Sequence, residues 1–235
     1  MNQVKTLSCL QWGQELFLNP YFFKYSGLKN TPNAKEFIEA SPKLLYTMKC
    51  IKSVKEYHER EKSIVSGQII YLNYKVDYFY LFAEYLVNEI GFSKDEVGII
   101  TGKENRVGDK TFDDKKDVAD LFNGIQIDEK GKEQKIDDSK RVKVLLGSKS
   151  IVEGINLQFY GTVMYNVFLE FLPTINVQAE GRIWRQKNNY NYVRIVYPLI
   201  ENSIDIFMFQ KLQDKTRRIN EIWTRTGEKN VLDTT

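Results

Sequence analysis

The feature that most constrains this 235-residue chain is a repeated alternation of short apolar strands with segments of helical periodicity. Strand-like runs occur at 68–74, 97–102, 141–148, 162–169 and 192–199, and helical patterns occur at 41–57, 76–91, 114–124, 174–186 and 203–223. Apolar, β-branched strands that alternate with helices are typical of a parallel sheet covered on both faces. We therefore predict an α/β fold with three layers and a mostly parallel sheet.

Residues at the ends of the predicted helices support these boundaries. Ser41 followed by Pro42 is typical of an N-cap and a first helical position. The helices over 76–91 and 114–124 both close on a glycine, the residue that most easily adopts the left-handed backbone found after many helices.

The chain divides by composition into a core region and more polar or irregular segments. Residues 1–40 are aromatic and rich in turn formers, so we expect an irregular arm or the tail of a preceding lobe there. The domain itself is expected over 41–223, with a tail over 224–235. The charged segments 103–113 and 125–140 are expected to be solvated surface insertions, with a DNA-gripping or partner-binding loop as the alternative.

Composition excludes several classes of protein. No apolar run approaches the roughly 20 residues of a membrane span, and the N-terminus lacks the pattern of a signal peptide. Cys9 and Cys50 have no metal or redox spacing, so we expect two free buried thiols in a reducing compartment. The single histidine, His58, argues against zinc and against His-dependent nucleophilic catalysis, so no metal site is expected. Abundant Asn, Lys, Ile and Tyr are typical of an A+T-rich genome, which favours a cytoplasmic protein of bacterial, phage or viral source.

Two segments that follow predicted strands carry residues suited to binding an anion. In open parallel sheets, ligands bind outside the carboxyl ends of the strands. The first segment is "GSKSIVEGINLQ" (147–158), where Gly154 lets the backbone approach a ligand closely. The second is "QAEGRIWRQ" (178–186), where Arg182 and Arg185 stand about one helical turn apart and are expected to project from one helix face. Taken separately, the first fits an ordinary turn and the second a solvated, salt-bridged helix face.

The order of these segments resembles the second, RecA-like ATPase lobe of superfamily-2 helicases and translocases. The likeness is greatest to the Swi/Snf-like branch and its phage, mobile-element and viral relatives. "VLLGSKSIVEGINLQ" is similar to the fifth motif of that family and "QAEGRIWRQ" to its sixth. "GQIIYLNY" is similar to the strand of the fourth motif, and "GIITGK" to the segment after it. The resemblance covers about residues 41–223.

The resemblance implies a role for each residue of the two motifs. Arg182 and Arg185 are similar to the arginine fingers that reach the β- and γ-phosphates of ATP held by the other lobe, with Arg185 directed at the γ-phosphate. Gln178 is implied to orient the phosphates or the attacking water. Gly154 and Asn156 are implied to line the nucleotide cleft or to couple it to nucleic acid.

The remaining roles implied by the resemblance concern the nucleic acid and the packing of the lobes. Ser148, Lys149 and Lys103 are implied to contact the backbone of a nucleic acid, DNA rather than RNA, without reading its sequence. Gly181 is implied to allow close packing, and Trp184 to lie in the core or at a lobe contact.

The sequence departs from a complete motor of this family in two ways. It has no G-x-x-x-x-G-K-[ST] segment to cradle phosphates, and no Asp-Glu pair at the end of a strand for magnesium. We therefore expect ATP and Mg²⁺ to be held mainly by an N-terminal ATPase lobe of the same parent protein, and this chain to be inactive alone. One alternative is a catalytically dead lobe that binds nucleic acid or protein, and another is a nucleotide-independent α/β enzyme such as a small-molecule transferase.

Overall fold

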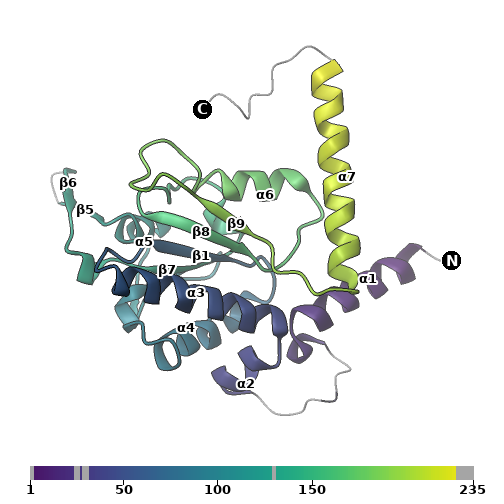
Figure 1. The fold of residues 1–235 in the computed structure, drawn as a ribbon, viewed down its shortest axis with the longest axis horizontal. Helices are drawn as coiled ribbons and strands as arrows, with labels where there is room; N and C mark the ends of the chain where they lie inside the picture. The colour runs from purple at the N-terminus through teal and green to yellow at the C-terminus, as the bar shows by residue number, and fades with distance from the viewer. Residues whose placement is uncertain (1–2, 24–26, 28–31, 129–130, 226–235) are drawn as a thin grey trace.

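The computed structural model of the chain describes residues 3–23, 27, 32–128 and 131–225. A seven-stranded sheet lies at its centre, in the order β4-β3-β2-β7-β1-β8-β9 (Figure 1). Its strands are β1 (Gly67–Tyr71), β2 (Val97–Ile100), β3 (Asn105–Val107), β4 (Lys110–Thr111), β7 (Val144–Gly147), β8 (Gly161–Asn166) and β9 (Arg194–Val196). Strands β2, β7, β1, β8 and β9 pair in parallel, which confirms the predicted mostly parallel sheet.

Helices cover both faces of this sheet and complete the three predicted layers (Figure 1). One face carries α2 (Ala34–Glu39), α3 (Pro42–Arg60) and α4 (Phe79–Asn88), and the other carries α5 (Lys115–Phe122) and α6 (Pro173–Glu180). Strand β1 shows how the sequence builds two cores at once: Ile70 packs on the first face, while its neighbours Ile69 and Tyr71 pack on the second. This alternation follows from the two-residue period of a strand.

The expected capping residues are found at the helix ends. The Ser41 hydroxyl accepts a hydrogen bond from the Leu44 amide at 3.2 Å, and Pro42 is the first residue of α3. Gly91 and Gly124, beyond the ends of α4 and α5, have φ angles of +81° and +69°, a left-handed backbone that favours glycine.

The N-terminal region is not the irregular arm that the sequence predicts, since it contains α1 (Gln3–Leu18) and α2. Two of its aromatic residues are buried in the core, Phe22 and Phe37, and Phe37 stacks on Tyr78 with ring centroids 5.4 Å apart. Leu18 and Phe22 belong to the same hydrophobic cluster. Two of the turn-forming residues that suggested irregularity cap helices instead: Asn19 caps η1 and Asn33 caps α2.

The two charged insertions form hairpins. Residues 103–113 supply β3 and β4, which extend the main sheet with antiparallel pairs at its edge. Residues 125–140 supply a separate two-stranded sheet of β5 (Ile125–Ile127) and β6 (Glu133–Lys135). Short 3₁₀ helices are η1 (Pro20–Phe22), η2 (Val76–Tyr78), η3 (Lys94–Glu96), η4 (Asp138–Lys140) and η5 (Lys149–Ile151).

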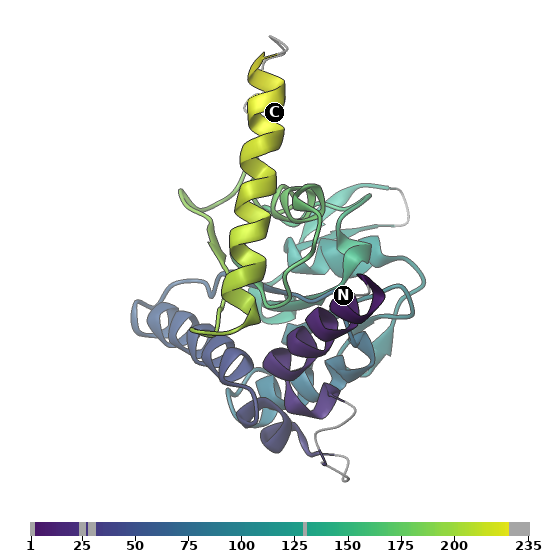
Figure 2. The ribbon, with the colours of Figure 1, turned by 90° about the vertical axis from the view of Figure 1, so that its right-hand side faces the viewer.

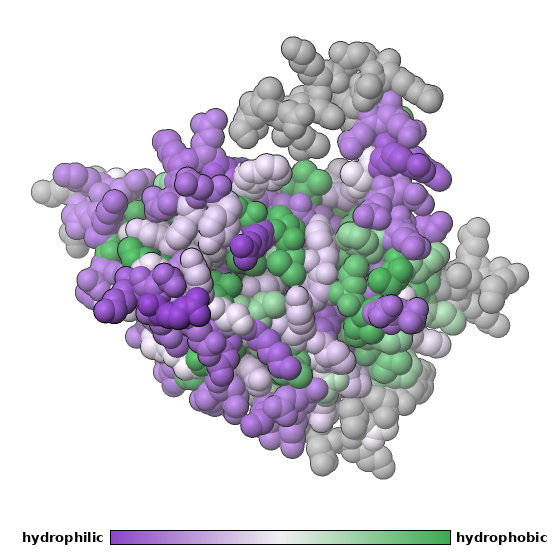
Figure 3. Space-filling view, in the orientation of Figure 1, coloured by the Kyte–Doolittle hydropathy of each residue, from purple (hydrophilic) through white to green (hydrophobic). Residues whose placement is uncertain are grey.

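The last helix, α7 (Ile204–Arg225), rises from the body of the domain beside α1 (Figure 2). Its first turn is anchored by Asp205, whose buried carboxylate lies 2.8 Å from the ammonium of Lys43 on α3. Met208 and Leu212 then pack against Leu169, whereas hydrophilic residues cover the projecting part (Figure 3). The predicted tail over 224–235 lies outside the described residues from position 226 onward. None of the helices in the described ranges is both long enough and apolar enough to span a membrane.

Candidate nucleotide and nucleic-acid site

The segments that follow three parallel strands meet at the carboxyl edge of the sheet. The Ser148 amide, after β7, donates to the carbonyl of Ile100, the last residue of β2, at 3.0 Å. The Lys149 amide donates to Oδ1 of Asn73, just after β1, at 3.2 Å. The turn after β7 is therefore fastened to both neighbouring strands, at the edge where ligands of such sheets bind.

Ser148 and Lys149 have different environments within this turn. Ser148 is 4% exposed, and its hydroxyl accepts a hydrogen bond from the Ser150 amide at 3.4 Å, so its side chain caps η5. Lys149 is exposed and is the residue of the pair whose charge can reach a ligand.

The loop from 150 to 159 is braced by two side chains that the sequence reasoning did not identify. Lys115, on α5, donates from Nζ to the carbonyls of Ser150 and Glu153 at 3.0 and 2.8 Å. Asn123 is 3% exposed and donates to the carbonyl of Asn156 at 2.7 Å. The only sequence signal for either residue is its place on or just after a Lys/Asp-rich helix, which does not reveal a contact more than 30 positions away.

The backbone conformation of this loop favours glycine at position 154. Its φ angle is +76°, which residues with a Cβ adopt at a cost. A Cβ there would lie 3.7 Å from the Lys115 ammonium, an ordinary contact distance, so the backbone conformation and not crowding favours glycine.

The helix predicted over 174–186 is shorter than expected, because α6 ends at Glu180. The next residues continue in tight turns, with the Arg182 amide donating to the carbonyl of Ala179 at 3.0 Å. The chain turns because Ile183 is fully buried against Gly161, and because the Arg182 carbonyl accepts from the Leu157 amide at 3.0 Å. The idea of one helix face bearing both arginines is thus wrong.

The two arginines converge nevertheless, through hydrogen bonds to the same loop. Arg182 donates from Nε to the carbonyl of Val152 at 2.6 Å and from Nη1 to that of Ile155 at 3.2 Å. Arg185 donates from Nη1 to Oδ1 of Asn156 at 2.5 Å and from Nε to the carbonyl of Gly181 at 2.7 Å. The structure therefore brings Arg182, Arg185 and Asn156 together.

The electrostatics of this cluster favour an anion. Burial lowers the pKa of Arg182, and the nearby Arg185 lowers it further, while Glu153 raises it in part. An arginine side chain carries its positive charge at neutral pH. Two cations held this close are each stabilised by a shared anion, such as a phosphate group.

The other predicted site residues lie around this cluster or apart from it. Gln178 is exposed on α6, one turn before Arg182. Lys103 is exposed beyond β2, with its Nζ 2.6 Å from Oδ1 of Asp77. Trp184 is 77% exposed, so a place in the core is wrong, and the alternative of a contact between lobes stays a prediction.

The cysteines and the histidine have structural surroundings. Both cysteines are free, but Cys9 is exposed and Cys50 is partly buried, so the expectation of two buried thiols is wrong. His58 is 4% exposed and its ring nitrogens lie 2.9 and 3.1 Å from the hydroxyls of Ser63 and Ser66. Within the described part of the chain, no group of three or more His, Cys, Asp or Glu side chains could hold a metal ion.

Comparisons of the sequence with known proteins find no match to a protein-family model and no match among curated proteins. Comparison of the structure does find similar folds. The C-terminal part of the Fun30 ATPase domain matches with a TM-score of 0.53 and 15% identity, over 82% of this chain and 50% of that one. S. cerevisiae Dbp5, solved with RNA and ADP BeF3, matches with a TM-score of 0.46 and 15% identity, over 79% of this chain and 37% of that one.

The chain thus spans half or less of the solved chains that it matches. At this level of identity the likeness establishes the fold. The resemblance predicted from the two motifs is confirmed in that sense: this chain shares the RecA-like α/β fold of the C-terminal part of the Fun30 ATPase domain.

Proposed function

We propose that this chain is the second ATPase lobe of a nucleic-acid-dependent ATPase of the helicase and translocase kind. The observation that carries the proposal is the convergence of Arg182, Arg185 and Asn156 beside the turn that ends β7, within a fold shared with part of an ATPase domain. In this proposal, ATP-driven closure of two lobes moves the protein along a nucleic-acid backbone.

The two arginines have different tasks in the proposed mechanism. Arg185 is exposed, and its planar fork of donors matches the oxygens of a γ-phosphate. Arg182 binds two carbonyls of the loop, so it links that loop to the nucleotide cleft and adds positive charge near the β-phosphate. Gln178 orients the phosphates or the attacking water, and Gly154 and Asn156 line the same cleft.

The donor set fits the phosphates of ATP but does not fit Mg²⁺. Guanidinium groups supply hydrogen-bond donors and fixed charge for phosphate oxygens, whereas Mg²⁺ needs carboxylate or carbonyl oxygens. The described residues contain no acidic cluster for the ion. We therefore assign ATP binding and Mg²⁺ mainly to an N-terminal lobe of the same parent protein, and we expect this chain alone to hydrolyse little or no ATP.

Nucleic acid is proposed to bind at the carboxyl edge beside this cleft. Lys149 offers an exposed ammonium at the turn after β7, and Lys103 offers another beyond β2. Ser148 supports this surface by capping η5. We expect DNA to be the preferred substrate, bound through its phosphates and therefore without sequence preference.

The nucleic-acid part of the proposal is tested by fluorescence anisotropy of the chain with labelled single- and double-stranded DNA and RNA. K149A should weaken binding and reduce the slope of log affinity against log salt by about one. K52A, which removes an exposed lysine on α3, is the matched control and should change neither quantity. Equal affinities for K149A and K52A would contradict this placement of the nucleic acid.

A catalytically dead lobe that binds nucleic acid or protein is the second candidate, and the lack of a G-x-x-x-x-G-K-[ST] segment is compatible with it as well as with the first. It predicts nucleic-acid or protein binding that ATP does not change. Measuring DNA affinity of the parent protein with and without ATP separates the two candidates.

A further inference from the structure

An open groove of about 890 Å³ lies between α6 and α7, and Tyr197, the residue that follows β9, also lines it. Its apolar walls include Val177 of α6 and Phe209 and Leu212 of α7. None of the residues assigned above to nucleotide or nucleic acid lines it. The groove is therefore a second concave surface, and an inference about it does not depend on the proposed function.

The groove is lined in part by a buried asparagine, Asn176. Asn176 is 3% exposed, and neither its Oδ1 nor its Nδ2 has a partner among the described residues. Leaving a buried polar group unsatisfied costs about 1–3 kcal/mol, so such groups generally have a partner when the protein functions. Asn176 lies one helical turn before Glu180, which places both side chains on the groove side of α6.

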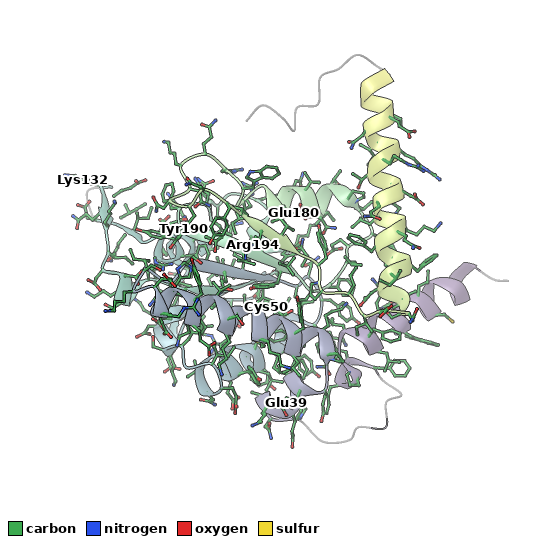
Figure 4. The ribbon with its side chains drawn as sticks, viewed as in Figure 1. Glu39, Cys50, Lys132, Glu180, Tyr190 and Arg194 are labelled. Carbon is green, nitrogen blue, oxygen red and sulfur yellow. The ribbon has the colours of Figure 1, made fainter. Side chains whose placement is uncertain are left out.

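Glu180, at the end of α6, adds a carboxylate to the lining of the same groove (Figure 4). Its Oε1 accepts hydrogen bonds from Nδ2 of Asn166, at 3.1 Å, and from the Tyr197 hydroxyl. Both donors reach the same oxygen, so the second oxygen keeps its lone pairs for a further donor. Burial raises the pKa of Glu180, because the protein withdraws water from the charged form. A donor that carries positive charge would compensate for that lost hydration.

The charges around the groove have the opposite sign to the charge of the whole chain. Three carboxylates line it, from Glu180, Asp214 and Glu221, against a single guanidinium, that of Arg217. Arg217 already lies 3.6 Å from Asp214 and 4.0 Å from Glu221. The chain as a whole carries a net charge of +3, so this groove is a locally acidic site that attracts a cation.

We propose that the groove between α6 and α7 is a docking site for a polypeptide partner that inserts an arginine side chain. The guanidinium would bind the Glu180 carboxylate through the oxygen that Asn166 and Tyr197 leave free, and the aliphatic stem would pack on Phe209 and Leu212. Arginine suits this site better than lysine because its flat fork can donate to two acceptors at once and can stack on an aromatic ring. The projecting part of α7 gives such a partner a second surface to lie along (Figure 2).

The proposal is tested by selecting a library of random twelve-residue peptides, displayed on phage, against the full chain. Selected peptides should share an arginine flanked by apolar residues, and replacing it by citrulline, its neutral isostere, should weaken binding at least tenfold. E180Q should weaken binding to the same extent. E61Q, which changes an exposed carboxylate on the far side of the sheet, is the matched control and should leave affinity unchanged.

A second variant keeps the test decisive if E180Q folds poorly. T216K places a competing cation on the wall of the groove without touching the hydrogen bonds of Glu180, and it should also weaken the peptide at least tenfold. The proposal is overturned if no peptide is selected, or if the selected peptides lack a cation. It is also overturned if they bind T216K as well as the unchanged chain, or if single-stranded DNA displaces them from the groove.

Discussion

The buried ion pair between Lys43 and Asp205 offers a quantitative test of how α7 is held. The two side chains are 3% and 5% exposed, and the ammonium lies 2.8 Å from the carboxylate. Burial lowers the pKa of Lys43, while the charge and hydrogen bond of Asp205 raise it in part. In the isosteric variant D205N, this ammonium would stay buried without an anionic partner.

The expected loss of stability follows from that arrangement. Breaking a buried pair by removing one partner costs about 3–5 kcal/mol, a large part of the roughly 5–15 kcal/mol that stabilises a typical domain. With a urea dependence of about 2.5 kcal/mol per M, a loss of about 4 kcal/mol lowers the midpoint of unfolding by roughly 1.5 M. The double variant K43M/D205N should recover most of this loss, because it leaves no buried charge.

The assay is urea unfolding followed by circular dichroism at neutral pH. D109N is the matched control, because the Asp109 carboxylate also lies 3.0 Å from the ammonium of a lysine, Lys94. In this pair, however, the side chains are exposed, 64% for Lys94 and 81% for Asp109. Exposed pairs contribute about 0–1 kcal/mol, so D109N should move the midpoint little. Similar midpoints for D205N and D109N, or no recovery in the double variant, would refute the reasoning.

Three further substitutions test the packing and the loop contacts. G161A should destabilise the chain by about 3 kcal/mol in urea unfolding, because the added Cβ would lie 2.5 Å from the Leu157 carbonyl oxygen; a loss below about 1 kcal/mol contradicts that contact. N123A should accelerate hydrogen exchange of the Phe159 amide, which donates to Oδ1 of Asn123 at 3.2 Å, and an unchanged exchange rate would show that the brace is unimportant. Burial raises the pKa of Glu180 above its ordinary 4.5, so its contribution to stability is present below about pH 4.5 and is lost as pH rises through the folded-state pKa. E180Q should remove this loss in urea titrations between pH 4.5 and 7, and an identical pH dependence in both proteins would contradict the shift.

Much of the fold could be predicted because its signals are local. The apolar strands, the Ser41-Pro42 helix start and the glycines after α4 and α5 each act within a few residues of their own position. The N-terminal helix α1 could not be found in this way. Gly13 lies within α1, and a glycine there would weaken an isolated helix. In the folded chain Gly13 faces the side chain of Ile204 on α7, 191 positions away, and a Cβ built at Gly13 would lie 3.5 Å from that side chain.

The candidate site was predictable as a set of residues but not as a geometry. The two motifs identify Arg182, Arg185 and Asn156, whereas the helix predicted through residue 186 gives the wrong reason for their proximity. Their convergence depends on carbonyls of a loop about 30 positions earlier and on the end of α6. Asn176 illustrates the same limit, because only the packed structure shows that this helical asparagine is buried with no hydrogen-bond partner among the described residues.

The most direct test of the central claim is nucleic-acid-stimulated ATP hydrolysis by the proposed two-lobe parent protein. If Arg185 is an arginine finger, R185A should lower stimulated turnover by at least about 10³-fold while ATP binding persists, since such fingers contribute about 10³–10⁵ in rate. R60A, which removes an exposed arginine on α3, should retain full turnover. Turnover of R185A equal to that of the unchanged protein would contradict the assignment and leave the arginine as a structural partner of Asn156.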